Sequence, residues 1–242
     1  MKLGELAFAC YIFDKIDKNK DKYKNFMEEN KSLNLSNNKD CVTLLKFLNS
    51  CWNCRRPKAS HEEAVKELKT WHKNCADKLF DKDKNLCKLE EGDLCSAANA
   101  YEKLLECKVE YITKNGKTRS ISFGPTTAAK ILFTLRPKAL PPWDNAIREE
   151  LVRKGSINGH GRDLYLNYLY CIKEVVHALR EDCKKHEFEL EKLPQELGRP
   201  DYITIPKLID EYYWITITQK IVPPTREVLQ RWLKWYNQEP RD

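Results

Sequence analysis

An isolated aspartate follows a long stretch of this chain that carries only positive charge. Between Tyr111 and Trp143 the 242-residue sequence contains six Lys or Arg and no Asp or Glu, and Asp144 ends the run. The cations suit the binding of an anion, and they favour the ionised form of a carboxyl group beside them. The stretch therefore combines groups that can hold phosphate with one negative side chain that can take part in electrostatic or acid–base chemistry.

The net charge of the chain is concentrated around this stretch. Residues 111–162 carry ten Lys or Arg against three acids, which accounts for the entire net charge of +7, so the rest of the chain sums to zero. Localised positive charge favours a polyanion such as a nucleic-acid backbone, because each neutralised phosphate also releases counterions. A solubilising surface is the alternative interpretation, and charge alone does not separate the two.

The centre of the stretch has a pattern with a defined spacing. The sequence reads GPTTAAK at 124–130 and PPWD at 141–144, so Asp144 lies 20 residues after Gly124. This pattern resembles the helix-hairpin-helix DNA glycosylases, in which a glycine-containing hairpin is followed by a helix with a small Thr-Ala or similar pair. In that superfamily an aspartate follows the last hairpin glycine at this spacing. The resemblance covers about 30 of the 242 residues.

The sequence departs from the family pattern at three points. The family hairpin usually reads Leu-Pro-Gly-x-Gly, whereas residues 120–124 read SISFG and lack the first glycine. Bifunctional members carry a Schiff-base lysine two residues after the last hairpin glycine, and Thr126 occupies that position here. Lys130 lies a turn further on, so we do not assign it that role. The carboxy-terminal four-cysteine cluster of iron–sulfur members is also missing.

The resemblance implies monofunctional hydrolysis of the N-glycosidic bond of a modified base that is flipped out of duplex DNA, without metal or cofactor. Asp144 would be the catalytic carboxylate, because bond cleavage builds positive charge on the sugar. Backbone amides at a helix start would hold a DNA phosphate. The residues expected to contact DNA are Gly124, Thr126, Thr127, Lys130, Lys117, Arg119, Trp143, Arg148 and His160.

Several of these roles have a structural alternative. Asp144 could cap the helix that follows it, and Trp143 could anchor the preceding link in the core instead of stacking on a displaced base. His160 could be an ordinary surface histidine. For the whole protein, the alternatives are a DNA-binding module that holds phosphate without excising bases, and a helical interaction protein whose basic patch meets an acidic partner.

Apolar residues recur at helical spacing along most of the chain, so the expected fold is all-α with one short β-hairpin. Residues 108–123 alternate weakly around Asn115-Gly116, a pair that favours a tight hairpin turn with positive φ at both residues. Expected helix starts are Asp40, a Ser60-x-x-Glu63 capping box, Gly124-Pro125 and Asp144. Further helices are expected near 3–17, 23–27, 94–107, 163–187, 206–219 and 226–237.

We expect residues 1–242 to form a single compact unit. The related fold has two helical lobes flanking a cleft, which here correspond to 40–142 and to 1–39 plus 143–242. The hairpin and the aspartate would lie at the mouth of that cleft. Residues 189–201 are the best candidate for a boundary in the sequence.

The cysteines and the apolar runs indicate an intracellular protein, cytoplasmic or nuclear. Ten scattered cysteines form no disulfide framework, which favours buried free thiols in a reducing compartment. Cys51 and Cys54 with His61, or with His72 and Cys75, could form a zinc site, although a lone CxxC pair is a weak signal. No apolar run is long enough to cross a membrane. Walker, Rossmann, serine-elbow and HExxH patterns are missing, so nucleotide hydrolysis, dinucleotide redox chemistry and zincin chemistry are not supported.

Overall fold

A computed structural model describes residues 1–31, 33–54, 57–225 and 227–228. Over these residues the fold is mostly helical with a two-stranded antiparallel sheet, which confirms the all-α prediction. None of the described helices is long and apolar enough to cross a membrane. The α-helices are α1 (Leu3–Ile16), α2 (Lys20–Glu29), α3 (Asn38–Trp52), α4 (His61–Asn74), α5 (Glu91–Glu106), α6 (Pro125–Leu135), α7 (Asn145–Arg153), α8 (Gly161–Lys185), α9 (Leu193–Glu196) and α10 (Ile205–Tyr213).

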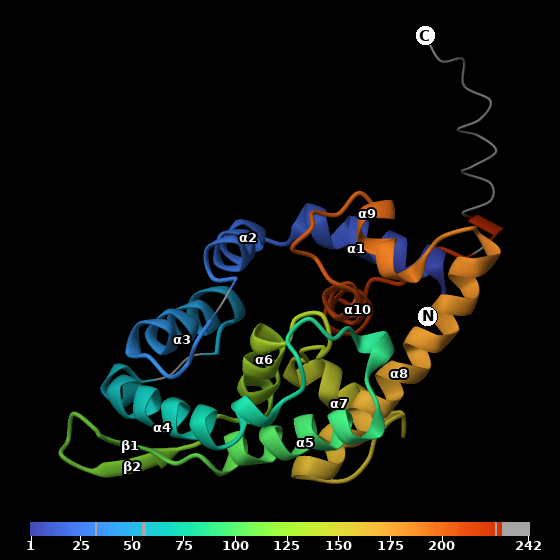
Figure 1. Ribbon diagram of the computed structural model, residues 1–242. Helices are drawn as coiled ribbons and strands as arrows, with labels where there is room; N and C mark the ends of the chain where they lie inside the picture. The colour runs from blue at the N-terminus through green and yellow to red at the C-terminus, as the bar shows by residue number, and fades with distance from the viewer. Residues whose placement is uncertain (32, 55–56, 226, 229–242) are drawn as a thin grey trace.

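The long helix α8 organises the packing of the other helices. Its buried residues recur at steps of three and four, from Tyr165 to Cys183, so one apolar stripe faces the core along the whole helix. Helix α5 packs against this stripe, and α10 packs against α1. Figure 1 shows α3 and α4 at the left of the view, α1 and α9 at the top, and α10 at the centre below α1 and α9. A continuous cluster of buried apolar residues runs from Leu3 to Tyr213. The division into lobes 40–142 and 1–39 plus 143–242 stays a prediction.

The hairpin forms where the sequence predicts it, but its turn is of another type. Strands β1 (Val109–Ile112) and β2 (Thr118–Ile121) pair antiparallel, with Ile112 opposite Thr118. In the turn, Gly116 has a φ of 74°, whereas Asn115 is not among the described residues with positive φ. The amide of Thr113 donates to the carbonyl of Lys117 at 2.9 Å, which closes a three-residue loop. A loop of this length needs positive φ only at its last residue, so the expectation for Asn115 was wrong.

Two expected helix caps are also wrong. Helix α3 is capped by Asn37, whose side chain accepts from the Asp40 amide at 2.8 Å, so Asp40 lies inside the first turn. Ser60 forms no capping hydrogen bond to α4, because its hydroxyl donates to the carbonyl of Pro57 at 2.7 Å. A short 3-10 turn at Lys58–Ser60 precedes α4 and leaves the serine in helical backbone, which removes the expected box.

The carboxy-terminal third is more continuous than the sequence suggests. The candidate boundary at 189–201 contains a 3-10 turn at Leu190–Lys192 followed by α9, and Leu190 and Leu193 are buried. Helix α10 runs directly into a π-helical turn at Trp214–Thr218. Most of the expected helix 226–237 lies outside the described residues.

Candidate functional site

The starts of α6 and α7 are held together by the link between them. The Trp143 indole is completely buried, and its Nε1 donates to the carbonyl of Pro125 at 3.2 Å. The Tyr168 hydroxyl donates to the carbonyl of Pro142 at 2.9 Å. The Trp143 ring lies 4.5 Å from that of Tyr168 and meets Tyr101 and Tyr165 edge-on. Because Trp143 precedes Asp144 and Pro125 follows Gly124, the indole hydrogen bond links the residue before the aspartate to the first residue of α6.

The start of α6 presents donors without acceptors. Gly124 is the N-cap and Pro125 is the first helical residue, where its missing N–H costs no helix hydrogen bond. The amide of Ala128 makes the first helical bond, to the Gly124 carbonyl at 3.0 Å. In the part of the chain that the structure describes, the amides of Thr126 and Thr127 contact no acceptor. Both residues are half-buried at the positive end of the helix dipole, which is an arrangement that suits an anion.

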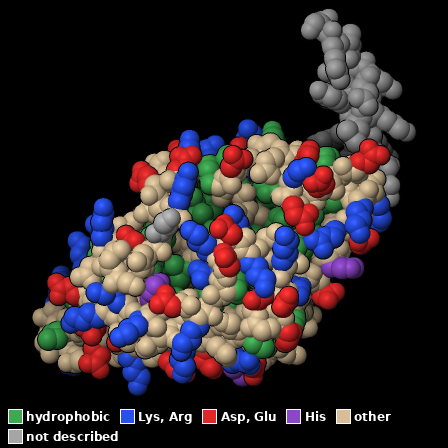
Figure 2. All heavy atoms as spheres, viewed as in Figure 1, with side chains coloured by type: hydrophobic (Ala, Val, Ile, Leu, Met, Phe, Trp, Pro, Cys, Tyr) green, Lys and Arg blue, Asp and Glu red, His purple; other side chains and the backbone are tan. Residues whose placement is uncertain are grey.

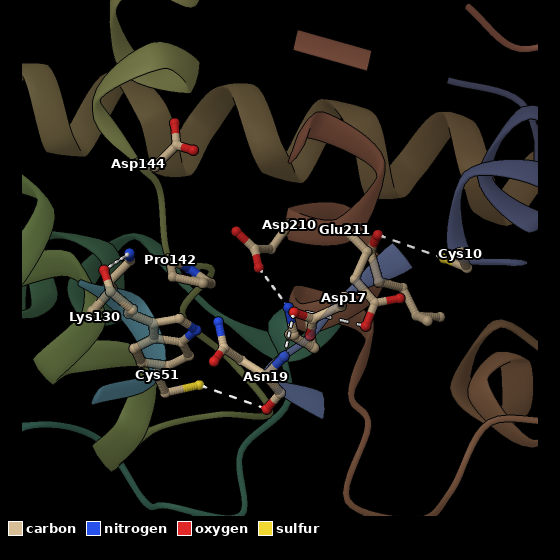
Figure 3. Close-up of polar contacts among 12 residues, drawn as sticks. Cys10, Asp17, Asn19, Cys51, Lys130, Pro142, Asp144, Asp210 and Glu211 are labelled. Atoms are coloured by element: carbon tan, nitrogen blue, oxygen red, sulfur yellow. Dashed lines mark hydrogen bonds and ion pairs between the residues drawn. The ribbon is translucent and has the colours of Figure 1, made fainter. Parts of the chain in front are cut away.

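Asp144 is a half-exposed N-cap whose two carboxylate oxygens are both engaged. Oδ1 accepts from the amide of Ile147 at 2.8 Å, so the capping alternative is confirmed. Oδ2 accepts from the hydroxyl of Thr218 at 2.9 Å. Each oxygen has a second acceptor position, so the carboxylate is fixed in orientation and can still bind a water or a developing cation. In Figure 3 Asp144 lies on the side of Pro142 and Lys130 and away from Glu211 and Cys10.

Two residues expected to contact DNA face the interior. Lys130 is 8% exposed, its Nζ lies 3.4 Å from the Trp52 carbonyl and 5.4 Å from the centre of the Trp52 ring, and Trp143 is 0% exposed. Side chains in these positions pack the core and cannot reach a phosphate or a displaced base from this conformation. The packing interpretation of Trp143 is thus the one that its burial favours, and Lys130 is not available to hold phosphate.

The basic segment 111–162 does not form a continuous free patch. Arg136 turns inward and donates to the carbonyl of Phe80 at 2.7 Å. Figure 2 shows Lys and Arg interspersed with Asp and Glu over the displayed face. Other cations of the segment are paired with acids: Lys138 with Asp83, Arg153 and Lys154 with Glu150, and Arg162 with Asp163. The linear charge count therefore overstates the positive charge that is free to meet a partner.

Four expected DNA contacts remain at or near the surface. Lys117 and Arg119 are exposed on the hairpin, and residues 122–124 connect β2 directly to α6. His160 is exposed at the N-cap of α8. The Arg148 side chain is 18% exposed; its Nη2 donates to Asn145, and its Nη1 is buried without a partner. Of these four residues, Arg119 is the nearest to the start of α6 along the chain.

A buried ionic cluster on α10 was not expected from the sequence. Glu211 is completely buried and accepts from Arg199 at 2.9 Å, and burial raises the pKa of Glu211 to about 7. Lys207 is 4% exposed, pairs with Asp210 at 2.8 Å and lies 4.4 Å from the centre of the Phe13 ring. The three α10 residues recur at i, i+3 and i+4, which is the one sequence signal that could have revealed the cluster.

Several cysteine thiols contact backbone carbonyls of the fold. The Cys51 thiol points at the carbonyl of Asn19 at 4.0 Å, and that of Cys54 points at the carbonyl of Trp52 at 3.7 Å. All ten cysteines are free. Within the described ranges, no group of three or more His, Cys, Asp or Glu is arranged to hold a metal ion.

No family model matches the chain, and searches of the curated proteins and of the solved structures find no significant match. Any function must therefore be argued from the geometry around Gly124 and Asp144.

Proposed function

We propose that the chain binds duplex DNA and hydrolyses the N-glycosidic bond of a flipped, modified base, with Asp144 as the catalytic carboxylate. The observation that carries this proposal is the hydrogen bond from Trp143 Nε1 to the Pro125 carbonyl. This bond connects the start of α6, where the Thr126 and Thr127 amides are free, to the start of α7, where Asp144 is half-exposed. A nucleotide whose phosphate meets the first start would have its sugar near the second.

The phosphate would bind at the start of α6. The amides of Thr126 and Thr127 supply two donors, the helix dipole favours a negative charge, and Gly124 has open space where a side chain would project. Lys117 and Arg119 would add contacts to neighbouring phosphates from the hairpin, because β2 leads directly into this helix. Arg148 and His160 complete the proposed contacts from α7 and from the start of α8.

The chemistry would then follow from charge. As the bond from C1′ of the sugar to the base nitrogen breaks, its electron pair leaves with the base, which takes up a proton from solvent, and the sugar becomes cationic. The Asp144 carboxylate would stabilise that cation and orient a water for attack on C1′, and the proton of that water would pass through the carboxylate to solvent. The hydrogen bonds from Ile147 and Thr218 hold the two oxygens in place, so little reorganisation is needed.

A DNA-binding module without catalysis is the second candidate. The observation that favours it is the engagement of both Asp144 oxygens in structural hydrogen bonds, which gives the residue a complete role as a helix cap. The proposed phosphate contacts at α6 do not depend on which of the two candidates is right.

The test is single-turnover base release from a panel of duplexes, each with one modified base, by the wild type and by Asp144→Asn. The proposal predicts release on at least one lesion and at least a hundredfold slower release by the variant, whose side chain can still cap α7. Release by both proteins at one rate would remove Asp144 from the mechanism. Salt-dependent binding without release on any lesion would leave the binding module, and salt-independent binding would favour the acidic protein partner.

A further inference from the structure

A cavity of about 950 Å³ opens at the opposite end of α6 from Gly124. Its walls come from α2, from the last residues of α6 and the link after it, and from residues 200–204. These segments belong to both of the expected lobes, and junctions of this kind are where small-molecule sites are concentrated. The volume lies within the range of such sites, about 300–1,000 Å³.

The inner wall of the cavity is apolar and partly aromatic. Phe26 and Leu135 are buried, and Met27, Leu33 and Tyr202 are half-buried around them. An apolar surface of this kind favours a ligand with a flat hydrophobic body, because burying that body removes its surface from water.

Arg136 supplies the charge in this wall. Its Nε donates to the Phe80 carbonyl at 2.7 Å and its Nη1 to the Leu135 carbonyl at 3.0 Å. Both acceptors are neutral, and among the described residues no carboxylate lies within ion-pair distance of this guanidinium. Asp77 and Asp81 act on it only from farther away, and burial lowers its pKa. The half-buried guanidinium thus makes no ion pair, although its centre lies 6.0 Å from the centre of the Phe80 ring, and its remaining N–H groups suit a carboxylate or a phosphate.

The rim of the cavity carries charge of both signs, because Glu28, Asp83 and Asp201 line it together with the lysines. Lys31 and Lys82 are exposed and line the opening, whereas Lys138 is paired with Asp83 at 2.7 Å. Because Glu28 and Asp201 offset Lys31 and Lys82 at the rim, the net positive charge of the lining comes from Arg136.

We propose that this cavity binds a small aromatic anion, with the aromatic body between Phe26 and Tyr202 and the anionic group on Arg136. The site is separate from the proposed DNA contacts and does not depend on them. A nucleoside monophosphate and an aromatic carboxylate share this chemistry, and the experiment distinguishes them.

The experiment is calorimetric titration of the full chain with two matched pairs of probes. AMP is compared with adenosine, and 2-naphthoate with its neutral amide. We expect saturable one-to-one binding of at least one anion, and at least tenfold weaker binding of its neutral partner. Preference for AMP identifies the ligand as a nucleotide, and preference for naphthoate identifies it as an aromatic carboxylate.

Two variants and one control variant locate the site. Met27→Trp fills the cavity from α2 and should abolish binding, whereas Val222→Trp, at a position that is 82% exposed, should not. Arg136→Gln should weaken the anion at least tenfold and leave the neutral partner unchanged, which a merely misfolded variant would not do. The proposal is overturned if neither anion binds, if Met27→Trp binds normally, or if Arg136→Gln weakens both members of a pair equally.

Discussion

Replacement of Asp144 separates its two roles, because Ala and Asn remove different parts of the side chain. Asp144→Ala deletes both oxygens and with them the bonds from the Ile147 amide and the Thr218 hydroxyl. Asp144→Asn keeps one acceptor for the Ile147 amide, and the Thr218 hydroxyl can rotate to accept from the new NH₂ group. Asparagine is as good an N-cap as aspartate, so the start of α7 should survive this change.

The expected magnitudes follow from these contacts. Loss of an N-cap costs about 0.5–2 kcal/mol, and loss of a second hydrogen bond costs about 0.5–1.5 kcal/mol. Asp144→Ala should therefore lower the free energy of unfolding by about 2 kcal/mol, or the melting temperature by about 4–8 °C. Asp144→Asn loses only the attraction between the carboxylate and the helix dipole, about 0.3–1 kcal/mol.

The assay is urea denaturation of the wild type and the two variants, monitored by tryptophan fluorescence and by circular dichroism. Equal stability of Asp144→Ala and the wild type would show that the two hydrogen bonds are not made in solution. Equal loss in both variants would mean that the charge, and not the hydrogen-bonding geometry, stabilises the start of α7. Either result would refute the description of Asp144 as an oriented carboxylate.

Three further predictions concern the buried cluster on α10, the link before α7 and the hairpin. Burial raises the pKa of Glu211 to about 7 from its ordinary 4.5. The stability that Glu211 contributes is therefore present below pH 4.5 and is lost as the pH rises through 7. In Glu211→Gln, the free energy of unfolding should change less with pH over this range. Trp143→Phe removes the bond to Pro125 and should cost about 1–3 kcal/mol in urea denaturation. The double variant Lys117→Ala/Arg119→Ala should weaken DNA binding and reduce the salt slope by about 1–2, measured by fluorescence anisotropy.

The DNA-binding prediction has a control variant, and each prediction has a result that would contradict it. Lys184→Ala removes an exposed cation of α8 that is paired with Glu181 at 2.7 Å, so it should leave the salt slope unchanged. An equal loss in this variant would mean that DNA responds to net charge and not to the hairpin. A Glu211→Gln protein with the pH profile of the wild type would assign the slope to other groups. Full stability of Trp143→Phe would show that the indole bond does not hold the two helix starts together.

Local signals in the sequence were enough to place most helices and the acid at the start of α7. Gly124-Pro125 and Asp144 act within one helical turn, so their effects can be predicted from neighbouring residues. The Ser60 box failed because Pro57 forms a 3-10 turn that captures the serine hydroxyl before it can reach α4. Such competition between local hydrogen bonds depends on backbone angles that the residue types alone do not determine.

Contacts between distant segments were beyond the reach of the sequence. Thr218 is 74 residues from Asp144 in the sequence and donates a hydrogen bond to it, and Asp83 is 55 residues from Lys138 and forms an ion pair with it. Lys130 was counted with the surface cations because lysine is seldom buried, yet the carbonyl and the ring of Trp52 hold it inside. The two helix starts at Gly124 and Asp144 were therefore predicted correctly, their roles in a site stay a prediction, and the expectation for Lys130 failed because tertiary packing decides which cations are free.

The most direct test of a DNA site at the starts of α6 and α7 is a titration of the ¹⁵N-labelled protein with a duplex that contains one stable abasic-site analogue, monitored through the amide chemical shifts. We expect the largest chemical-shift changes for the amides of Thr126 and Thr127 and for those around Asp144, and these changes should diminish as salt is added. Shifts that leave the starts of α6 and α7 unchanged, or that cluster on the far end of α8, would contradict it.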